Sequence, residues 1–242
     1  MRLNRFLAAA GLGSRRSCED LVREGRIEVN GVIVTFPGHE VEPGTDNVCS
    51  DGERVRAPRR WLYYVMYKLA GYVTTRADER GRKTVDELLG RLRGRVFPVG
   101  RLDRATEGLL LFTNNGELAE RLLHPRFHHE RTYVAWVTPP PGVHTLRAIE
   151  AGGVPIGRGG HSGPAKARLI GRRHDPARVR ITLHEGKYRE VRRIFRAFDL
   201  RVLVLRRVSF AGLLLNDLEP GGIRPLTELE RELLAKRSGL IL

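Results

Sequence analysis

The sequence predicts an α+β protein built from a small N-terminal module and a larger, sheet-rich domain. Three observations lead to this prediction. Apolar residues recur at helical spacing near the amino terminus, short segments with strand patterns fill much of the remaining chain, and two capping-box sequences open helices further along. The chain has 242 residues, 41% of them hydrophobic, which is enough to bury a core in one or two domains.

The N-terminal module begins with two predicted helices. From Leu3 to Ala10 the apolar residues follow the i, i+3, i+4, i+7 spacing of one buried helix face. This spacing and the shortness of the apolar run argue against a signal or transit peptide. Ser14 is the predicted N-cap of a second helix, and Gly25 is its predicted end.

A β-hairpin is predicted after these helices. Ile27 and Val29 alternate with charged residues, Val32 and Val34 resume the two-residue spacing, and Asn30-Gly31 between them is a strong hairpin-turn signal. The polar, proline-containing stretch 51–60 follows and is interpreted as leading into a linker. We therefore predict a module over residues 1–56, a linker over 57–60 and a larger domain over 61–242.

The larger domain is predicted to interleave strands and helices. Thr84 with Glu87, and Thr227 with Glu230, form the two capping boxes that open helices. The Asn115-Gly116 pair is a turn signal after the apolar segment at 109–113. The predicted strands cover residues 61–67, 109–113, 132–137, 165–170, 179–183 and 202–206. No internal repeat or low-complexity tract is evident.

The charge of the chain predicts a polyanionic partner. There are 43 Lys plus Arg against 28 Asp plus Glu, a formal net charge of +15, and 38 of the basic residues are arginine. Residues 61–242 carry +14 of this charge. No run approaches the roughly 20 apolar residues of a bilayer-spanning helix, so a membrane role is not expected. Cys18 and Cys49 are too few for a disulfide framework, which favours a cytoplasmic protein.

A predicted helix over 187–198 concentrates arginine on one face. Four arginines follow helical spacing there, and four apolar residues follow the same spacing on the opposite face. Such a face is either a solvated surface or a contact for an anion, and the mutual repulsion of the arginines favours the anion. The arginines are Arg189, Arg192, Arg193 and Arg196.

Asp103 is the candidate reactive carboxylate. It lies between Arg101 and Arg104, and nearby cations favour the ionised form that a nucleophile or base requires. Composition alone leaves open a plain turn aspartate. A glycosidase pair of Asp103 with Glu107 is disfavoured in so basic and aromatic-poor a chain. The histidines at 124, 128 and 129 lack the accompanying ligands of a zinc site, so neither a metal nor another cofactor is predicted.

An ordered set of motifs resembles the RsuA/RluB family of pseudouridine synthases over essentially the whole chain. In the first part Ser14-Arg-Arg16, Gly25-Arg26 and Val29-Asn-Gly31 resemble the small αL RNA-binding module, or S-four domain, of that family. The motifs of the larger domain are Gly100-Arg-Leu-Asp103, Thr106-Glu-Gly-Leu-Leu-Leu-Phe-Thr-Asn114, Gly116-Glu-Leu118, His124-Pro-Arg126, Arg131-Thr-Tyr133, Pro164-Ala-Lys-Ala167 and Glu185-Gly-Lys-Tyr-Arg-Glu-Val-Arg-Arg-Ile194.

The resemblance implies isomerisation of a uridine in RNA, without cofactor or metal, in a mainly antiparallel mixed-sheet catalytic domain. Asp103 matches the essential aspartate, and Arg101 matches the residue that fills the space left by the flipped nucleotide. Tyr133 matches the tyrosine that stacks on the flipped ring. Arg192 matches the arginine that pairs with the carboxylate, and Ile194 the apolar residue beneath the base.

The expected partner is ribosomal RNA or a pre-ribosomal particle. The residues of the Pro164–Ala167 and Glu185–Ile194 motifs favour large-subunit RNA. The protein is expected to act as a monomer. The alternative is a non-catalytic RNA-binding assembly factor, which would have no need of Asp103. A DNA-binding role is weaker, because no recognition helix stands out. The predicted RNA contacts, each equally compatible with plain surface, are Arg2, Arg5, Arg15, Arg16, Arg26, Arg189, Arg193 and Arg196.

The chain departs from the family pattern at several positions, none of which is one of these site residues. Lys68-Leu-Ala-Gly71 stands where the family often has Lys-Pro-x-Gly, and Asn114-Asn-Gly116 stands at an expected hairpin. Asp199 replaces an expected glycine after the arginine-rich helix, where aspartate tolerates the left-handed conformation better than most residues do.

Overall fold

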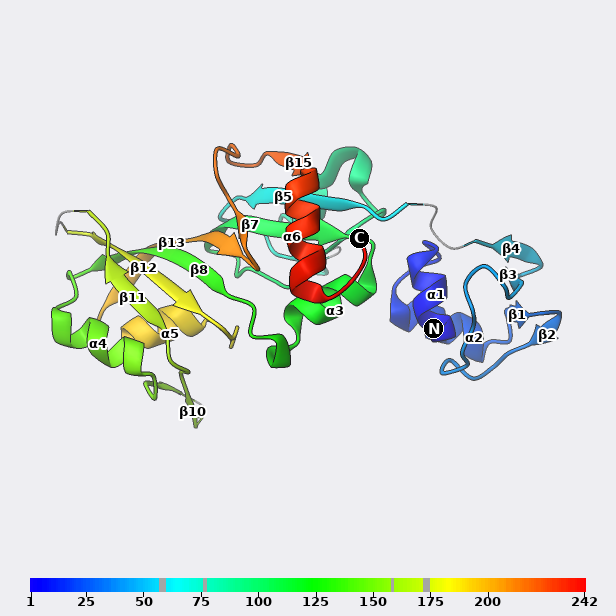
Figure 1. Ribbon diagram of the computed structural model, residues 1–242, viewed down its shortest axis with the longest axis horizontal. Helices are drawn as coiled ribbons and strands as arrows, with labels where there is room; N and C mark the ends of the chain where they lie inside the picture. Colours follow the sequence, from blue (N-terminus) through cyan, green and yellow to red (C-terminus); the bar gives the residue numbers. More distant parts are fainter. Residues whose placement is uncertain (57–59, 76–77, 158, 172–174) are drawn as a thin grey trace. The chain divides into compact units, whose positions relative to one another are not determined.

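The computed structural model describes residues 1–56, 60–75, 78–157, 159–171 and 175–242 (Figure 1). The chain divides into two compact units. One comprises Met1–Leu62 with Asn114–Gly116, and the other Tyr63–Thr113 with Glu117–Leu242. The sequence boundaries 1–56, 57–60 and 61–242 stay a prediction, and positions 57–59 of the predicted linker lie outside the described residues.

The N-terminal unit contains the two predicted helices, α1 (Leu3–Ala9) and α2 (Arg15–Arg23). Ser14 caps α2, since its side chain accepts a hydrogen bond from the Ser17 amide at 3.1 Å. The apolar faces of both helices pack on β1 (Ile27–Val29) and β3 (Val48–Ser50), so the module has its own small core. This core is what the helical spacing at the amino terminus predicted.

The small sheet has the order β2-β1-β3-β4. The predicted hairpin is confirmed, because β1 pairs antiparallel with β2 (Val32–Ile33) across the Asn30-Gly31 turn. The stretch 51–60, interpreted from the sequence as leading into a linker, contains a strand near its beginning, where β4 (Glu53–Val55) pairs with β3. This strand lies at the sheet edge and is largely exposed. Two of its three residues are charged, so its sequence lacks the apolar alternation that would predict a strand.

A nine-stranded mixed sheet forms the larger unit, with the order β11-β12-β8-β13-β7-β5-β15 and β6 and β14 off this path. Of its strand pairings in the described residues, only that of β7 with β13 is parallel. The strands are β5 (Tyr63–Lys68), β6 (Phe97–Pro98), β7 (Thr106–Thr113), β8 (Arg131–Thr138), β11 (Lys166–Leu169), β12 (Ala177–Leu183), β13 (Arg201–Phe210), β14 (Leu213–Leu214) and β15 (Ile223–Pro225). The six strands predicted from the sequence are confirmed as β5, β7, β8, β11, β12 and β13. A separate hairpin pairs β9 (Pro155–Gly157) with β10 (Gly160–His161).

Two hydrophobic cores hold the helices on this sheet (Figure 1). One joins β5 and β7 to α3 (Gly116–Leu123) and α6 (Glu228–Ser238). The other joins β8, β11 and β12 to α4 (Val143–Ala151) and α5 (Glu190–Arg196). A short 3₁₀ turn, η2 (Pro125–Phe127), lies between α3 and β8. Among the described residues no helix has the length and apolarity needed to cross a membrane.

Two helix predictions and one turn prediction need correction. The segment opened by the Thr84 capping box is a 3₁₀ helix, η1 (Val85–Leu92), interrupted at Gly90, where φ is +52°. The Asn115-Gly116 pair is not a hairpin turn, since Gly116 begins α3 and the apolar residues after it have helical rather than strand spacing. Helix α5 is shorter than the predicted 187–198, because Arg189 and Asp199 adopt left-handed conformations on either side of it. The capping box at Thr227 does open a helix, α6.

Candidate active site

Asp103 lies in the loop between β6 and β7, and backbone contacts fix this loop on both sides of it. Thr74 is bonded to Leu102 twice: its hydroxyl donates to the Leu102 carbonyl at 2.8 Å and accepts from the Leu102 amide at 3.2 Å. The Gly71 amide donates to the Arg104 carbonyl at 2.7 Å. Asp103 is half-buried in this loop, whereas Arg101 beside it is exposed.

Lys68 ties the Asp103 loop to the sheet. Its side chain is fully buried at the end of β5, and its Nζ donates to the carbonyls of Leu69, Asp103 and Thr106 at 3.0, 3.2 and 2.7 Å. Burial lowers the pKa of Lys68 to about 8, an effect that the negative charges of Asp103 and Glu107 oppose. In the sequence Lys68 stands out only as part of a divergent motif, and no sequence signal indicates that its side chain is buried and holds the Asp103 loop.

One row of cross-strand neighbours joins Lys68 to Tyr133. Tyr133 of β8 is in register with Arg207 of β13, Arg207 with Gly108 of β7, and Gly108 with Lys68 of β5. Paired residues in neighbouring strands share a sheet face. Gly108 is required in this row, because a Cβ atom there would lie 2.3 Å from the Arg207 carbonyl oxygen. The row therefore places Tyr133 on the same side of the sheet as Lys68, which holds the Asp103 loop.

Two buried arginines surround Tyr133. Arg207 is 3% exposed, its Nε donates to the Leu109 carbonyl at 2.8 Å, and its guanidinium lies 5.0 Å from the centre of the Phe210 ring. Arg131 faces the same ring at 5.4 Å. Burial lowers the pKa of Arg207, while the electrostatic interaction with Tyr133 opposes this shift. Arg207 was also missed, since an arginine in a strand pattern reads as an outward-facing residue.

Arg192 links α5 to the Asp103 loop. Its Nη1 donates to the Val202 carbonyl at 2.7 Å and its Nη2 to the Ala105 carbonyl at 3.0 Å. Burial lowers the pKa of Arg192, and the Asp103 charge opposes that shift, so the two side chains interact electrostatically. In this structure the guanidinium contacts the backbone two residues beyond Asp103 rather than its carboxylate. Ile194, on the same helix, is fully buried in the core of α5 and β8.

The other arginines of the predicted helix face do not converge on this site. Arg189 and Arg196 are exposed, and Arg193 is half-buried with its Nη1 donating to the Tyr188 carbonyl at 3.3 Å. Arg189 precedes the helix in a left-handed conformation, so the predicted stripe of four is interrupted at its first member.

The five predicted RNA contacts of the N-terminal unit differ in how they are engaged. Arg2, Arg15 and Arg16 are exposed, and Arg5 is half-buried. Arg26 is bound by the Asp51 carboxylate, with its Nη2 2.6 Å from Oδ2. Arg15 and Arg16, at the start of α2, are therefore the adjacent exposed pair of the module.

Two alternatives considered from the sequence find no geometric support. Glu107 accepts a hydrogen bond from Arg206 Nε at 2.7 Å on the face of the sheet opposite to Lys68 and Gly108, which separates it from the Asp103 loop. In the described part of the chain no group of three His, Cys, Asp or Glu side chains is arranged to hold a metal ion.

Comparisons with known proteins define the class of this fold and site. A family model described as RNA pseudouridylate synthase matches residues 62–197, and a model of the S4 domain matches residues 1–47. The chain belongs to the RNA pseudouridylate synthase family and carries an RNA-binding S4 domain ahead of the catalytic fold. The predicted family and the α+β fold class are thereby confirmed, and the protein is an enzyme.

Individual relatives match over nearly the full length. The chain is 38% identical over 231 residues to the ribosomal large subunit pseudouridine synthase B of Bacillus subtilis (strain 168), which covers 95% of this chain and 93% of that protein. It is 39% identical over 241 residues to an uncharacterized RNA pseudouridine synthase of Aquifex aeolicus (strain VF5), covering 99% and 96%. A crystal structure of a pseudouridylate synthase superposes with a TM-score of 0.70 at 28% identity, covering 97% of this chain and 99% of that one.

Proposed function

We propose that this enzyme converts a specific uridine of ribosomal RNA, in the large subunit, into pseudouridine. The observation that carries the proposal is the placement of Asp103. Its loop is held by Lys68, Thr74 and Gly71 at one end of the residue row that ends at Tyr133, and Arg192 joins the same loop to α5. The match to a ribosomal large subunit synthase supports the choice of RNA.

In the proposed reaction the bond between C1′ of the ribose and N1 of the uracil breaks, and a bond between C1′ and C5 forms. Asp103 acts as the ionised carboxylate, either on the ring or at the sugar. The uridine must leave its stack to reach Asp103, and Arg101, exposed in the same loop, fills the vacated position. No electrons enter or leave, and the proton on C5 moves to N1.

Tyr133, Arg192 and Ile194 are the proposed partners of Asp103. Tyr133 stacks on the flipped uracil and takes part in moving the C5 proton. Arg192 adds positive charge beside the carboxylate, and Ile194 supports the base from the core side. The remaining arginines named from the sequence contact phosphate. We further propose that the protein works in the cytoplasm as a monomer, on free ribosomal RNA or a pre-ribosomal particle.

Site-resolved pseudouridine mapping of ribosomal RNA tests the proposal. RNA from cells producing the wild type, Asp103→Asn or Asp217→Asn would be compared, with Asp217 as an exposed control carboxylate. One large-subunit uridine should convert with the wild type and the control, and conversion with Asp103→Asn should fall by at least about a thousandfold, the scale of losing a covalent or acid–base group. Binding of RNA without conversion of any uridine would instead support an assembly factor.

A further inference from the structure

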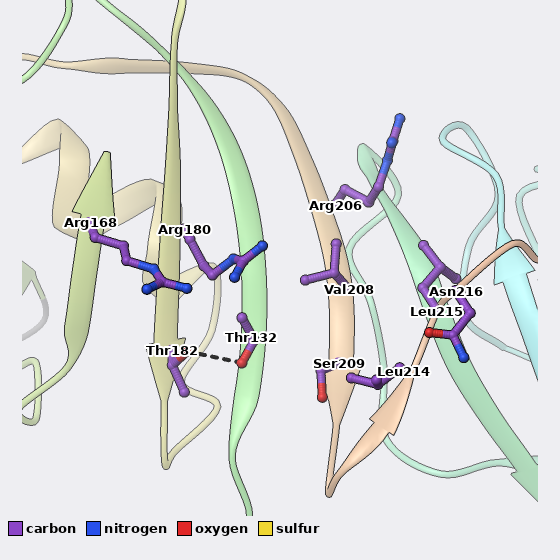
Figure 2. Close-up of a pocket in the computed structure, with 10 residues that line it drawn as sticks. All are labelled: Thr132, Arg168, Arg180, Thr182, Arg206, Val208, Ser209, Leu214, Leu215 and Asn216. Atoms are coloured by element: carbon purple, nitrogen blue, oxygen red, sulfur yellow. Dashed lines mark hydrogen bonds between the residues drawn. The ribbon is translucent and has the colours of Figure 1, made fainter. Parts of the chain in front are cut away.

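The larger unit has a second basic surface, away from Asp103. An open hollow of about 640 Å³ lies over β11, β12, β8 and β13 (Figure 2). Its lining side chains alternate along the strands with those that pack against α5: Thr132 lines it while Tyr133 faces α5, and Thr182 lines it while Ile181 faces α5. Because successive side chains of a strand point to opposite faces, the hollow lies on the sheet face opposite to Tyr133 and Arg192.

Two arginines of this hollow are placed against each other. Arg168 of β11 and Arg180 of β12 are directly opposite in register, an arrangement in which like charges destabilise a sheet. Neither forms an ion pair with a carboxylate in the described residues, and the buried Nε of Arg180 has no hydrogen-bond partner there. Figure 2 shows both side chains extending across the sheet toward Thr132. A bound anion would relieve this repulsion.

Beside the arginines, the lining suits a sugar–phosphate chain. The hydroxyls of Thr132 and Thr182 lie 2.9 Å apart, and Ser209 and Asn216 add further donors and acceptors. The apolar side chains of Val208 and Leu214 lie among them, and Leu214 is 52% exposed. Guanidinium groups match phosphate, hydroxyls match the ribose 2′-OH, and exposed apolar side chains match the faces of sugars and bases.

The third arginine, Arg206, is already engaged at the rim. Its Nε lies 2.7 Å from Glu107, and its guanidinium is 5.1 Å from the centre of the Trp136 ring and 5.6 Å from that of Tyr67. Its position there leaves Arg168 and Arg180 as the pair whose charge is uncompensated in the described residues.

We propose that this hollow binds the backbone of a second segment of the substrate RNA, remote from the target uridine, with Arg168 and Arg180 as its phosphate ligands. The proposal rests on the proposed function in one respect, the identity of ribosomal RNA as substrate. An RNA chain must extend past the edge of the sheet to reach both faces, so only RNA larger than the isolated target stem-loop gains from this contact.

The experiment compares Arg168→Gln/Arg180→Gln with Arg91→Gln/Arg147→Gln, a control that removes the same charge from exposed positions outside the hollow. Dissociation constants are measured over a series of salt concentrations. The probes are deproteinised large-subunit rRNA and the isolated stem-loop that contains the mapped uridine. Thermal unfolding of both variants verifies that they fold.

For the large rRNA, a plot of log affinity against log salt has a negative slope. Arg168→Gln/Arg180→Gln should reduce the magnitude of this slope by roughly 1.4 to 1.8, the effect of two lost phosphate contacts, and the control should reduce it less. Binding and kcat on the stem-loop should equal those of the wild type. Equal effects of the two variants on large rRNA would overturn the proposal, as would an equal loss on the stem-loop. Failure of the proposed function would appear separately, as a wild type that converts no uridine.

Discussion

Lys68 and Arg207 are buried cations whose described hydrogen bonds go to backbone carbonyls rather than to carboxylates. Burying a charged side chain costs free energy unless hydrogen bonds compensate for the lost water. We therefore expect a buried cation where its hydrogen bonds hold nearby backbone segments in fixed positions. Both lie in the row from β5 to β8, and general rules for sequences place lysine and arginine outside the core. Motif resemblance in the sequence predicts Asp103, Tyr133 and Arg192 as site residues, and this stays a prediction. It does not predict the buried cations that the structure places near them.

Lys68→Met should disable the enzyme by loosening the Asp103 loop. The substitution keeps most of the apolar volume but leaves three carbonyls without their donor, so the free energy of unfolding should fall by about 3 kcal/mol or more. Misplacement of the carboxylate should also lower kcat by roughly a hundredfold. Urea unfolding and single-turnover conversion measure these two effects, with Lys236→Met as an exposed control. Wild-type kcat in a folded Lys68→Met protein would contradict this function of Lys68.

Glu190 should make stability depend on pH. Its carboxyl is 4% exposed, and burial together with Glu185 raises its pKa from 4.5 to about 7, whereas Lys187 opposes the shift. Between these values the folded state binds more protons than the unfolded state, so stability is full below about pH 4.5 and declines as pH rises through 7. The pKa of Glu185 is lowered, so its own contribution changes at lower pH.

The test is the free energy of unfolding of Glu190→Gln measured from about pH 5 to pH 8. The variant keeps a hydrogen-bond donor toward Glu185 and cannot ionise, so the decline seen in the wild type should flatten. Glu219→Gln, an exposed control, should keep the wild-type profile. A parallel decline in Glu190→Gln and the wild type would assign the pH dependence to other groups.

At the scale of elements, α5 is delimited by two residues with positive φ, Arg189 at 51° and Asp199 at 56°. Glu190 closes the first turn by accepting from the Lys187 amide at 2.9 Å. Apolar spacing predicts the buried face of this helix correctly, but spacing alone cannot indicate that a residue with a left-handed conformation ends the helix. The same limit applies to η1. Its apolar spacing predicts a continuous helix, whereas the structure has a 3₁₀ helix that is interrupted at Gly90.

Asp199→Gly should stabilise the protein by up to about 1 kcal/mol, because glycine adopts the left-handed conformation without a Cβ penalty. The sequence analysis anticipated this conformation at Asp199. Chemical denaturation of the variant measures the gain. Asp217→Gly serves as the control, since Asp217 lies outside the positive-φ region and should gain nothing. A similar change in both variants would show that backbone strain at Asp199 is not being relieved.

Strand prediction succeeded where the two sheet faces differ and failed for short strands at a sheet edge. The sequence of β12 alternates apolar and polar residues from Ala177 to Leu183, a pattern that is typical of a strand. β4 and β15 have three residues each, and their pairing partners rather than their own composition make them strands. The Asn115-Gly116 signal failed for a related reason, because a turn dipeptide forms a hairpin only when a return strand follows.

For the whole molecule, charge is divided unequally between the parts of the chain. Residues 1–60 carry nearly balanced charge, so the S4 domain offers a few placed arginines rather than a broad positive field. Arg15→Gln/Arg16→Gln should raise KM for ribosomal RNA by roughly tenfold at moderate salt and leave kcat unchanged, because these side chains bind phosphate without touching the reacting base.

Steady-state kinetics on the mapped RNA measures both constants. The matched control is Arg54→Gln/Arg56→Gln, which removes two exposed charges from the same module. An equal rise in KM in both double variants would indicate general charge attraction rather than a defined contact, and a fall in kcat would place Arg15 or Arg16 closer to the chemistry than proposed.

The parallel pairing of β7 with β13 limits how early the site can assemble while the chain is being synthesised. Glu107 and Arg206, which meet across this pairing, are 99 residues apart in the chain. Asp103 and Tyr133 are therefore translated long before Arg207 can join their strands, and so distant a contact closes late because of the entropy of the long loop. A nascent chain that ends before β13 holds every predicted reactive residue and still lacks Arg207, so we expect no activity until β13 has been made and has paired with β7.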